Sequence, residues 1–181
     1  MAISSYRNFL ISLLVLLFTL SGSTATTDSI YKRHIDVTKV CSLVKDKDYC
    51  SDILVDYAGI YGLDVKDVGT IFINEAMYRA KDAINKLMDL IPKARGDLKS
   101  NLTHCNQFYM SFLQTDKGNL SELLGKQDYI GLNREAVILA KHAIHCEESF
   151  KSVPSPLTLY NSAFFNSIDM ISAFSYLLIH Q

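Results

Sequence analysis

The chain has 181 residues, 20% of them charged, and a formal net charge of −1. This charge provides none of the basic excess that nucleic-acid binding requires, so we expect no nucleic-acid partner. Three prolines, eight glycines and no tryptophan leave few turn residues for a β-sandwich, and the length suits one domain with a substantial core. The composition therefore favours a single helical domain.

The first 25 residues have the pattern of a cleavable export signal. Arg7 gives a positive start, an apolar run of twelve residues follows at 9–20, and small residues at 23–25 suit a signal peptidase. The run is far shorter than the ~20 residues that a helix needs to span a bilayer. We predict cleavage after about Ala25, which changes the formal charge to −2 and leaves a soluble, extracellular domain at 26–181 with no membrane partner.

Four segments of the remaining chain repeat apolar residues at spacings of three and four, which is the period of an amphipathic helix. The breaks between them lie at 91–96, 125–128 and 152–156, and each contains Pro or Gly. We predict an all-α fold, an antiparallel (up-down-up-down) four-helix bundle. The four stripes are Ile73, Ala76, Ala80, Ala83, Leu87 and Leu90; Leu98, Leu102, Cys105, Tyr109 and Phe112; Leu132, Ala136, Leu139, Ala143, Cys146 and Phe150; and Leu157, Tyr160, Phe164, Ile168, Ile171, Phe174 and Leu178.

Residues 30–61, ahead of the bundle, indicate an N-terminal helical hairpin with a charged interruption at 45–48. On one straight helix Cys41 and Cys50 would lie roughly 13 Å apart, beyond the ~7 Å Cα limit for a disulfide, so the chain must turn between them. The other two cysteines lie on the inward stripes of successive helices. Four cysteines permit three pairings, and export favours disulfides. The simplest pairing joins Cys41 to Cys50 and Cys105 to Cys146.

Few residues suggest catalysis. The chain has no phosphate-binding glycine loop, no nucleophile elbow and no His-Glu-x-x-His sequence, and an even number of cysteines leaves no free thiol. A zinc site at His142, His145 and Glu148 would need a neighbouring cysteine in its reduced form, which export disfavours. Solvated histidines are the favoured interpretation. We therefore expect no metal, no cofactor and no enzymatic activity.

Two asparagines, Asn101 and Asn119, each begin an Asn-x-Ser/Thr sequence, which an exported eukaryotic chain presents for glycosylation. Asn119 is the better candidate because Gly118 beside it indicates a helix break. Asn101 lies on nearly the same side of its helix as Cys105, so we expect partial shielding there.

Three stretches, at 40–54, 102–109 and 128–150, resemble the plant invertase and pectin methylesterase inhibitor family. The first is similar to the family's opening Cys-x8-Cys with a tyrosine before the second cysteine, and the second to its Leu-x-x-Cys-x-x-x-Tyr segment. The third is similar to its Asp-Tyr, Asn, Ala and Cys-Glu-x-x-Phe series. The order and spacing of the stretches behind an export signal are jointly specific. The residues concerned are Cys41, Tyr49, Cys50, Leu102, Cys105, Tyr109, Asp128, Tyr129, Asn133, Ala136, Cys146, Glu147 and Phe150.

This resemblance implies a four-helix bundle with an N-terminal hairpin, cysteines paired first with second and third with fourth, and a stoichiometric inhibitor that covers the active site of a cell-wall carbohydrate enzyme. Invertase inhibitors often carry Pro-Lys-Phe between the third and fourth cysteines. Here the only Pro-Lys pair, Pro92-Lys93, lies before the third cysteine, and the residue after Lys93 is Ala94 instead of Phe. The Asp128-Tyr129 pattern resembles the pectin methylesterase branch better, although His145 stands where members commonly have Thr.

We therefore expect a secreted, apoplastic inhibitor of pectin methylesterase. One alternative is an inhibitor of cell-wall or vacuolar acid invertase, because the two branches share a fold. A more remote alternative is a non-inhibitory exported binding protein, which the alanines on the facing stripes disfavour because they leave no large cavity.

The expected partner-binding surface lies on the exposed flanks of the second and third bundle helices and their connection, near Asp128, Tyr129, Asn133 and His142. Imidazoles gain charge as pH falls through about 6.5, so binding at His142 should depend on pH. The alternative interpretation is that Asp128 only caps the third helix and Tyr129 only packs at its start.

Overall fold

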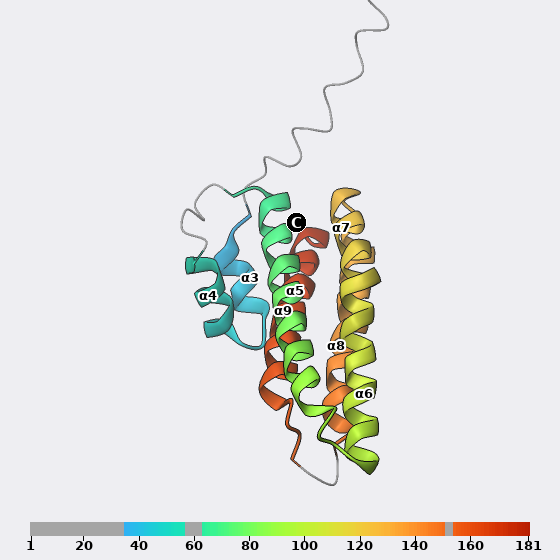
Figure 1. Cartoon of the computed structure of the whole chain (residues 1–181). Helices are drawn as coiled ribbons and strands as arrows, with labels where there is room; N and C mark the ends of the chain where they lie inside the picture. Colours follow the sequence, from blue (N-terminus) through green and yellow to red (C-terminus); the bar gives the residue numbers. More distant parts are fainter. Residues whose placement is uncertain (1–34, 57–62, 151–153) are drawn as a thin grey trace, which may run out of the picture. The chain divides into compact units, whose positions relative to one another are not determined.

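The structure, a computed structural model, describes residues 35–56, 63–150 and 154–181, so the predicted export signal at 1–25 lies outside the described residues. Four antiparallel units form a bundle, with a helical hairpin beside it (Figure 1). The predicted all-α bundle with an N-terminal hairpin is confirmed. Its elements are α3 (Val37–Leu43), α4 (Lys47–Asp56), α5 (Val65–Leu90), α6 (Gly96–Ser111), η1 (Phe112–Asp116), α7 (Lys117–Gly125), α8 (Tyr129–Glu148) and α9 (Thr158–Ile179).

The four predicted apolar stripes form the core of the bundle, as the helical period requires. Small residues let α5 approach its neighbours closely: a Cβ atom added at Gly69 would lie 2.7 Å from the Leu124 side chain of α7. Leu98 is an exception, because it is 38% exposed in the first turn of α6, where a helix end has neighbours on fewer sides. Leu90, Tyr160 and Leu178 are half-buried, and the other stripe residues are buried.

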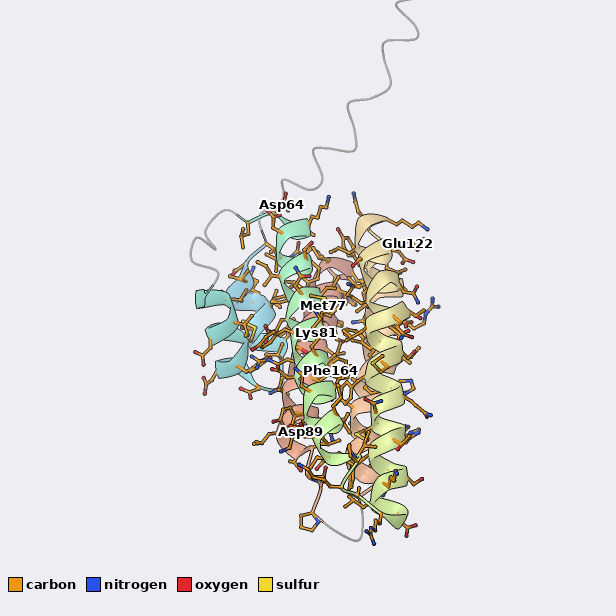
Figure 2. All side chains as sticks on the ribbon, viewed as in Figure 1. Asp64, Met77, Lys81, Asp89, Glu122 and Phe164 are labelled. Carbon is orange, nitrogen blue, oxygen red and sulfur yellow. A yellow bond between two sulfur atoms is a disulfide. The ribbon has the colours of Figure 1, made fainter. Side chains whose placement is uncertain are left out.

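The last helix, α9, lies at the centre of the packing. By length and composition alone it could cross a membrane, but it contacts α8, α5, α3 and α4. Its Phe164 ring points into the bundle (Figure 2) and meets the rings of Phe108, Tyr109 and Phe112 edge-on, with centroids 5.0 to 5.6 Å apart. Such edge-to-face pairs add to the stabilisation from burial. The apolar character of α9 is therefore that of a core helix.

A disulfide and a buried polar chain join three of the bundle helices. Cys105 of α6 and Cys146 of α8 form a disulfide with Cα atoms 5.3 Å apart. The Tyr109 hydroxyl donates to Asn161 Oδ1 of α9 at 2.6 Å, and Asn161 Nδ2 donates to Glu147 Oε2 of α8 at 2.6 Å. Burial, and secondly the charge of Glu147, raise the pKa of Tyr109, so its hydroxyl remains a donor. This junction fixes α6, α8 and α9 against one another.

The hairpin is held together by a disulfide and held to the bundle by a hydrogen bond from Tyr49 of α4 to the buried carboxylate of Glu75 on α5. The chain turns between α3 and α4, as predicted, so that Cys41 and Cys50 form a disulfide with Cα atoms 5.5 Å apart. The carboxylate of Glu75 on α5, only 6% exposed, accepts hydrogen bonds from the Tyr49 hydroxyl at 2.8 Å and from Arg79 Nε at 2.6 Å. A buried carboxylate with two such donors is well compensated.

The expected helix break at Gly118 is wrong. Gly118 and Asn119 lie inside α7, and the irregularity comes earlier, at the π-helical turn η1, where the Lys117 N–H donates to the Phe112 carbonyl. A glycine inside a helix costs only about 1 kcal/mol relative to alanine. Burial of Leu120 and Leu124 on the same helix outweighs that cost.

Removing the two disulfides should destabilise the fold unequally. The loops that they close, with sequence separations of 9 and 41, predict losses of about 2.7 kcal/mol for Cys41→Ala with Cys50→Ala and about 3.9 kcal/mol for Cys105→Ala with Cys146→Ala. Urea unfolding of the two double variants measures both losses, and non-reducing peptide mapping of the parent checks the pairing. Equal losses, or crossed disulfides, would contradict this assignment.

Candidate functional site

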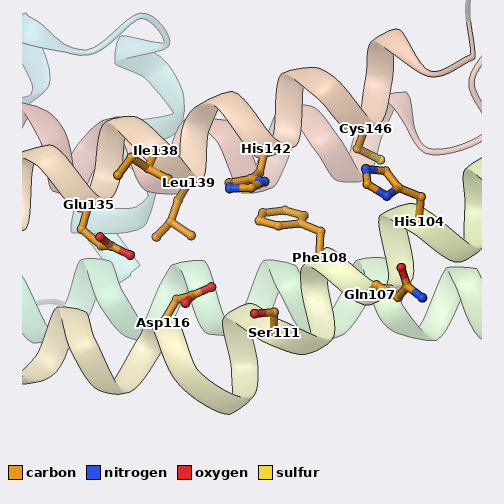
Figure 3. A pocket seen from close by; sticks show the side chains of 10 residues that line it. All are labelled: His104, Gln107, Phe108, Ser111, Asp116, Glu135, Ile138, Leu139, His142 and Cys146. Atoms are coloured by element: carbon orange, nitrogen blue, oxygen red, sulfur yellow. The ribbon is translucent and has the colours of Figure 1, made fainter.

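The candidate site is a surface groove between α6–η1 on one side and α8 on the other. Its volume is about 290 Å³, and Figure 3 shows side chains from both walls pointing into it. The groove lies between α6–η1, in the second unit of the bundle, and α8, the third unit. This is the face at which the sequence predicts partner binding. Its lining residues are His104, Gln107, Phe108, Ser111, Asp116, Glu135, Ile138, Leu139, His142 and Cys146.

The floor of the groove is a stacked pair of rings. Phe108 of α6 and His142 of α8 are nearly parallel, with centroids 5.0 Å apart and planes 10° apart. Phe108 also meets the core ring of Phe164 edge-on at 5.6 Å, so the stack is anchored to the bundle interior. His142 is exposed on its other side. The groove therefore presents an imidazole whose orientation is set by the core.

Two carboxylates face each other across one end of the groove. Asp116, the last residue of η1, and Glu135 of α8 point into it from opposite walls (Figure 3). Neither forms a hydrogen bond or an ion pair with any residue that the structure describes. Partial burial raises the pKa of Asp116, and the nearby His142 acts in the opposite direction. The last residue of the wide π-helical turn is thus an acid whose charged form is disfavoured by folding. A π-helical turn and a shifted pKa both occur often at functional positions.

The lining of the groove offers few groups for nucleophilic or metal chemistry. Ser111 is the only hydroxyl among the lining residues, and it has no hydrogen bond to either histidine of the groove. Among the described residues no group of three or more His, Cys, Asp or Glu could hold a metal ion. The groove instead offers a floor of two stacked rings, Phe108 and His142, with two carboxylates at one end and the imidazole of His104 at the other (Figure 3).

The structure gives Asp128 and Tyr129 local roles at the start of α8. Asp128 is the N-cap residue, and its Oδ1 accepts a hydrogen bond from the Gly131 N–H at 2.8 Å. A Cβ atom at position 131 would lie 2.5 Å from Asp128 Oδ2, so a larger residue there would displace the capping carboxylate. Tyr129 is half-buried against the core. Both residues therefore have the local roles that the capping interpretation predicts. These roles leave the predicted contact of Asp128 and Tyr129 with a partner as a prediction.

The third predicted residue, Asn133, lies against α9 and does not line the groove. Its Nδ2 donates to the Ser172 carbonyl at 2.9 Å and lies 3.2 Å from the hydroxyls of Ser172 and Ser175. This bond ties α8 to α9 along the side opposite the groove. Of the four predicted partner-binding residues, His142 alone lines the groove.

Sequence reasoning missed the two carboxylates of the groove. Glu135, Ile138 and His142 have the three- and four-residue spacing of one helix face, and this signal could have placed Glu135 beside His142. Asp116 carries no comparable signal, because its direction depends on the π-helical turn that precedes it.

The two glycosylation sequences occupy different surroundings. Asn101 is half-buried on α6, and its Nδ2, the atom that would carry a glycan, donates to the Ser149 carbonyl at 2.7 Å at the end of α8. Asn119 is exposed on α7, and its side chain forms no hydrogen bond with a described residue. The contrast supports the preference for Asn119.

The fold matches two crystal structures of pectin methylesterase inhibitors. One, a mutant form from Arabidopsis, aligns with a TM-score of 0.68 and 16% identity over 78% of this chain and 96% of that chain. Another, from Arabidopsis thaliana, aligns with a TM-score of 0.58 and 16% identity over 79% and 95% of the two chains. No family model and no curated protein matches the sequence. The shared helical fold is therefore established by structure.

Replacing Asp116 by Asn should stabilise the protein near neutral pH. A carboxyl whose pKa is raised by folding destabilises the folded state once pH exceeds its unfolded value of 3.8, and this penalty vanishes below that value. We expect a higher melting temperature for Asp116→Asn at pH 7 and no gain at about pH 3. Asp52→Asn, at an exposed position on α4, is the control. A gain of equal size at both pH values would show that the charge of Asp116 is not its cause.

Glycan occupancy should differ between the two sequences. In the protein from a secretory eukaryotic host, we expect Asn119 to be occupied and Asn101 to be largely unmodified, because only Asn119 is exposed and without a side-chain hydrogen bond to the described chain. Glycopeptide mass spectrometry measures both. Full occupancy at Asn101 would mean that modification precedes folding of this end of α6.

Proposed function

We propose that this chain is a secreted inhibitor of pectin methylesterase, which occludes the enzyme's active-site cleft in a reversible, stoichiometric complex and so modulates methylesterification of cell-wall pectin. The observation that carries the proposal is the shared fold, which covers 96% of one pectin methylesterase inhibitor chain. The three sequence stretches that resemble the family, and the predicted export signal, support the same function and a location in the apoplast.

Inhibition by this chain would be non-covalent. Its four cysteines are all in disulfides, and the groove holds no nucleophile hydrogen-bonded to a base. A protein contact of about 1,600 Å² is enough for tight binding without a covalent bond. The complex should therefore dissociate into two unmodified proteins.

The groove between α6–η1 and α8 supplies a contact surface for the target. A basic side chain of the enzyme would fit between Asp116 and Glu135, and a planar or apolar group would pack on the ring stack at His142. The titratable groups that face the groove are these two acids, His104 and His142. Histidines generally gain charge between pH 8 and pH 5, so acidification would reduce the negative charge of the groove and weaken its hold on a basic group.

Inhibition of pectin methylesterase tests the proposal directly. The protein purified from a secretory host is titrated against pectin methylesterase and, separately, against acid invertase, the alternative target. We expect loss of methylesterase activity with an endpoint near one inhibitor per enzyme, full recovery after dissociation, and no effect on invertase. Inhibition of invertase alone would transfer the function to the alternative, and a covalently altered target would exclude occlusion.

A pair of variants locates the contact within the inhibitor. Replacing His142 by Ala should weaken inhibition about tenfold and flatten its pH dependence, with little change in melting temperature because the imidazole is exposed. Replacing Asn133 by Ala is the control, because it removes a hydrogen bond between α8 and α9. It should lower the melting temperature and leave the inhibition of the folded protein nearly unchanged. An unchanged pH profile in His142→Ala would eliminate this histidine as the pH-responsive group.

A further inference from the structure

The outer face of α8 carries an apolar line that the fold does not use. Ile130, Val137 and Ile144 are 68%, 41% and 43% exposed and recur every seven residues. The opposite face of the same helix packs into the core. The outer line of a bundle helix is ordinarily polar, so three large aliphatic residues along it are unusual.

Two basic residues alternate with the aliphatic ones along this line. Arg134 and Lys141 complete a series with spacings of four, three, four and three, which keeps all five side chains on one ridge of the helix. Neither basic side chain forms an ion pair or a hydrogen bond with any residue that the structure describes. We call these five residues the α8 ridge.

The spacing of the α8 ridge is that of one seam of a coiled coil, with aliphatic residues at one seam position and cations at the other. We propose that the α8 ridge is a docking surface for an acidic amphipathic helix of a partner protein. Apolar residues of the partner pack on Ile130, Val137 and Ile144, and its carboxylates pair with Arg134 and Lys141. The ridge spans about 21 Å, so a partner helix of about four turns covers it.

Charge selects this occupant over two others. In a parallel pairing with a second copy of this chain, Arg134 and Lys141 would face like charges, which disfavours that form of self-association. A membrane surface would need a broad apolar face, whereas this ridge has cations between its aliphatic residues and is followed on the same line by the acid Glu148. The α8 ridge also differs in sign from the groove, whose unpaired groups include two carboxylates. The proposal does not depend on which enzyme the chain inhibits.

A charge-swap experiment with a synthetic probe tests the α8 ridge. The probe is a fluorescent, helical peptide of about 20 residues with Leu at one seam position and Glu at the other, and its partner probe has Lys in place of Glu. Binding to the protein from a secretory host is measured by fluorescence anisotropy. We expect the Glu peptide to bind about tenfold tighter than the Lys peptide, and the double variant Arg134→Glu with Lys141→Glu to reverse that preference.

Matched controls distinguish the α8 ridge from general electrostatics. Lys81→Glu with Lys99→Glu makes the same change of net charge at exposed positions on α5 and α6, and should leave the preference intact. Val137→Ser with Ile144→Ser should weaken both peptides. If the charge-reversed protein melts early, Arg134→Gln with Lys141→Gln tests the same pairing and should abolish the preference.

Three outcomes would overturn the proposal. The first is equal binding of the two peptides by the parent protein. The second is a preference that survives the ridge substitutions. The third is that phosphatidylserine vesicles bind, or that a dimer forms in sedimentation experiments, in a way that the ridge substitutions abolish while neither peptide binds.

Discussion

The rest of the structure depends on the junction at Cys105–Cys146. The disulfide fixes the distance between α6 and α8, and the hydrogen bonds from Tyr109 through Asn161 to Glu147 fix both helices against α9. One turn along the same helices, this register places Phe108 over His142. A buried polar chain in which each member has a partner specifies one arrangement of the helices, because any slip would leave a buried oxygen or amide unsatisfied. The groove therefore inherits its geometry from the junction.

The residues that carry the family resemblance build the scaffold. Tyr49 holds the hairpin to α5 through Glu75, Tyr109 and Glu147 belong to the junction, and Asn133 bonds α8 to α9. None of these roles selects a partner. The structural neighbour has this fold at 16% identity, so the fold does not require most of the residues of this chain. The groups left to contact another molecule are those at the surface, such as the side chains of the groove.

The fold was predictable because burial imposes a period on the sequence, and the four stripes needed only that period. The cysteine pairing needed the export signal and the family resemblance as well, because three pairings were possible. The site was less accessible. Gly118 suggested a break that packing of Leu120 and Leu124 overrides, and the turn before α8 places Gln127, not Gly125, in the left-handed region with φ of 58°. Asp116 points into the groove because it ends a π-helical turn. No local sequence pattern predicts that turn.

Three faces of α8 have different surroundings, and each is under a different physical constraint. Leu132, Ala136 and Leu139 face the core, where volume and shape restrict what is tolerated. Glu135 and His142 face the groove, and the α8 ridge faces outward, where a change of charge alters no packing. Folding tolerates the Asp116 carboxyl in the groove although partial burial raises the pKa of that carboxyl. The junction explains this tolerance. The free energy of folding lost at one surface acid is small compared with the stabilisation from a disulfide and from an interior chain of hydrogen bonds. Surface charge on this scaffold is thus free to follow the demands of binding.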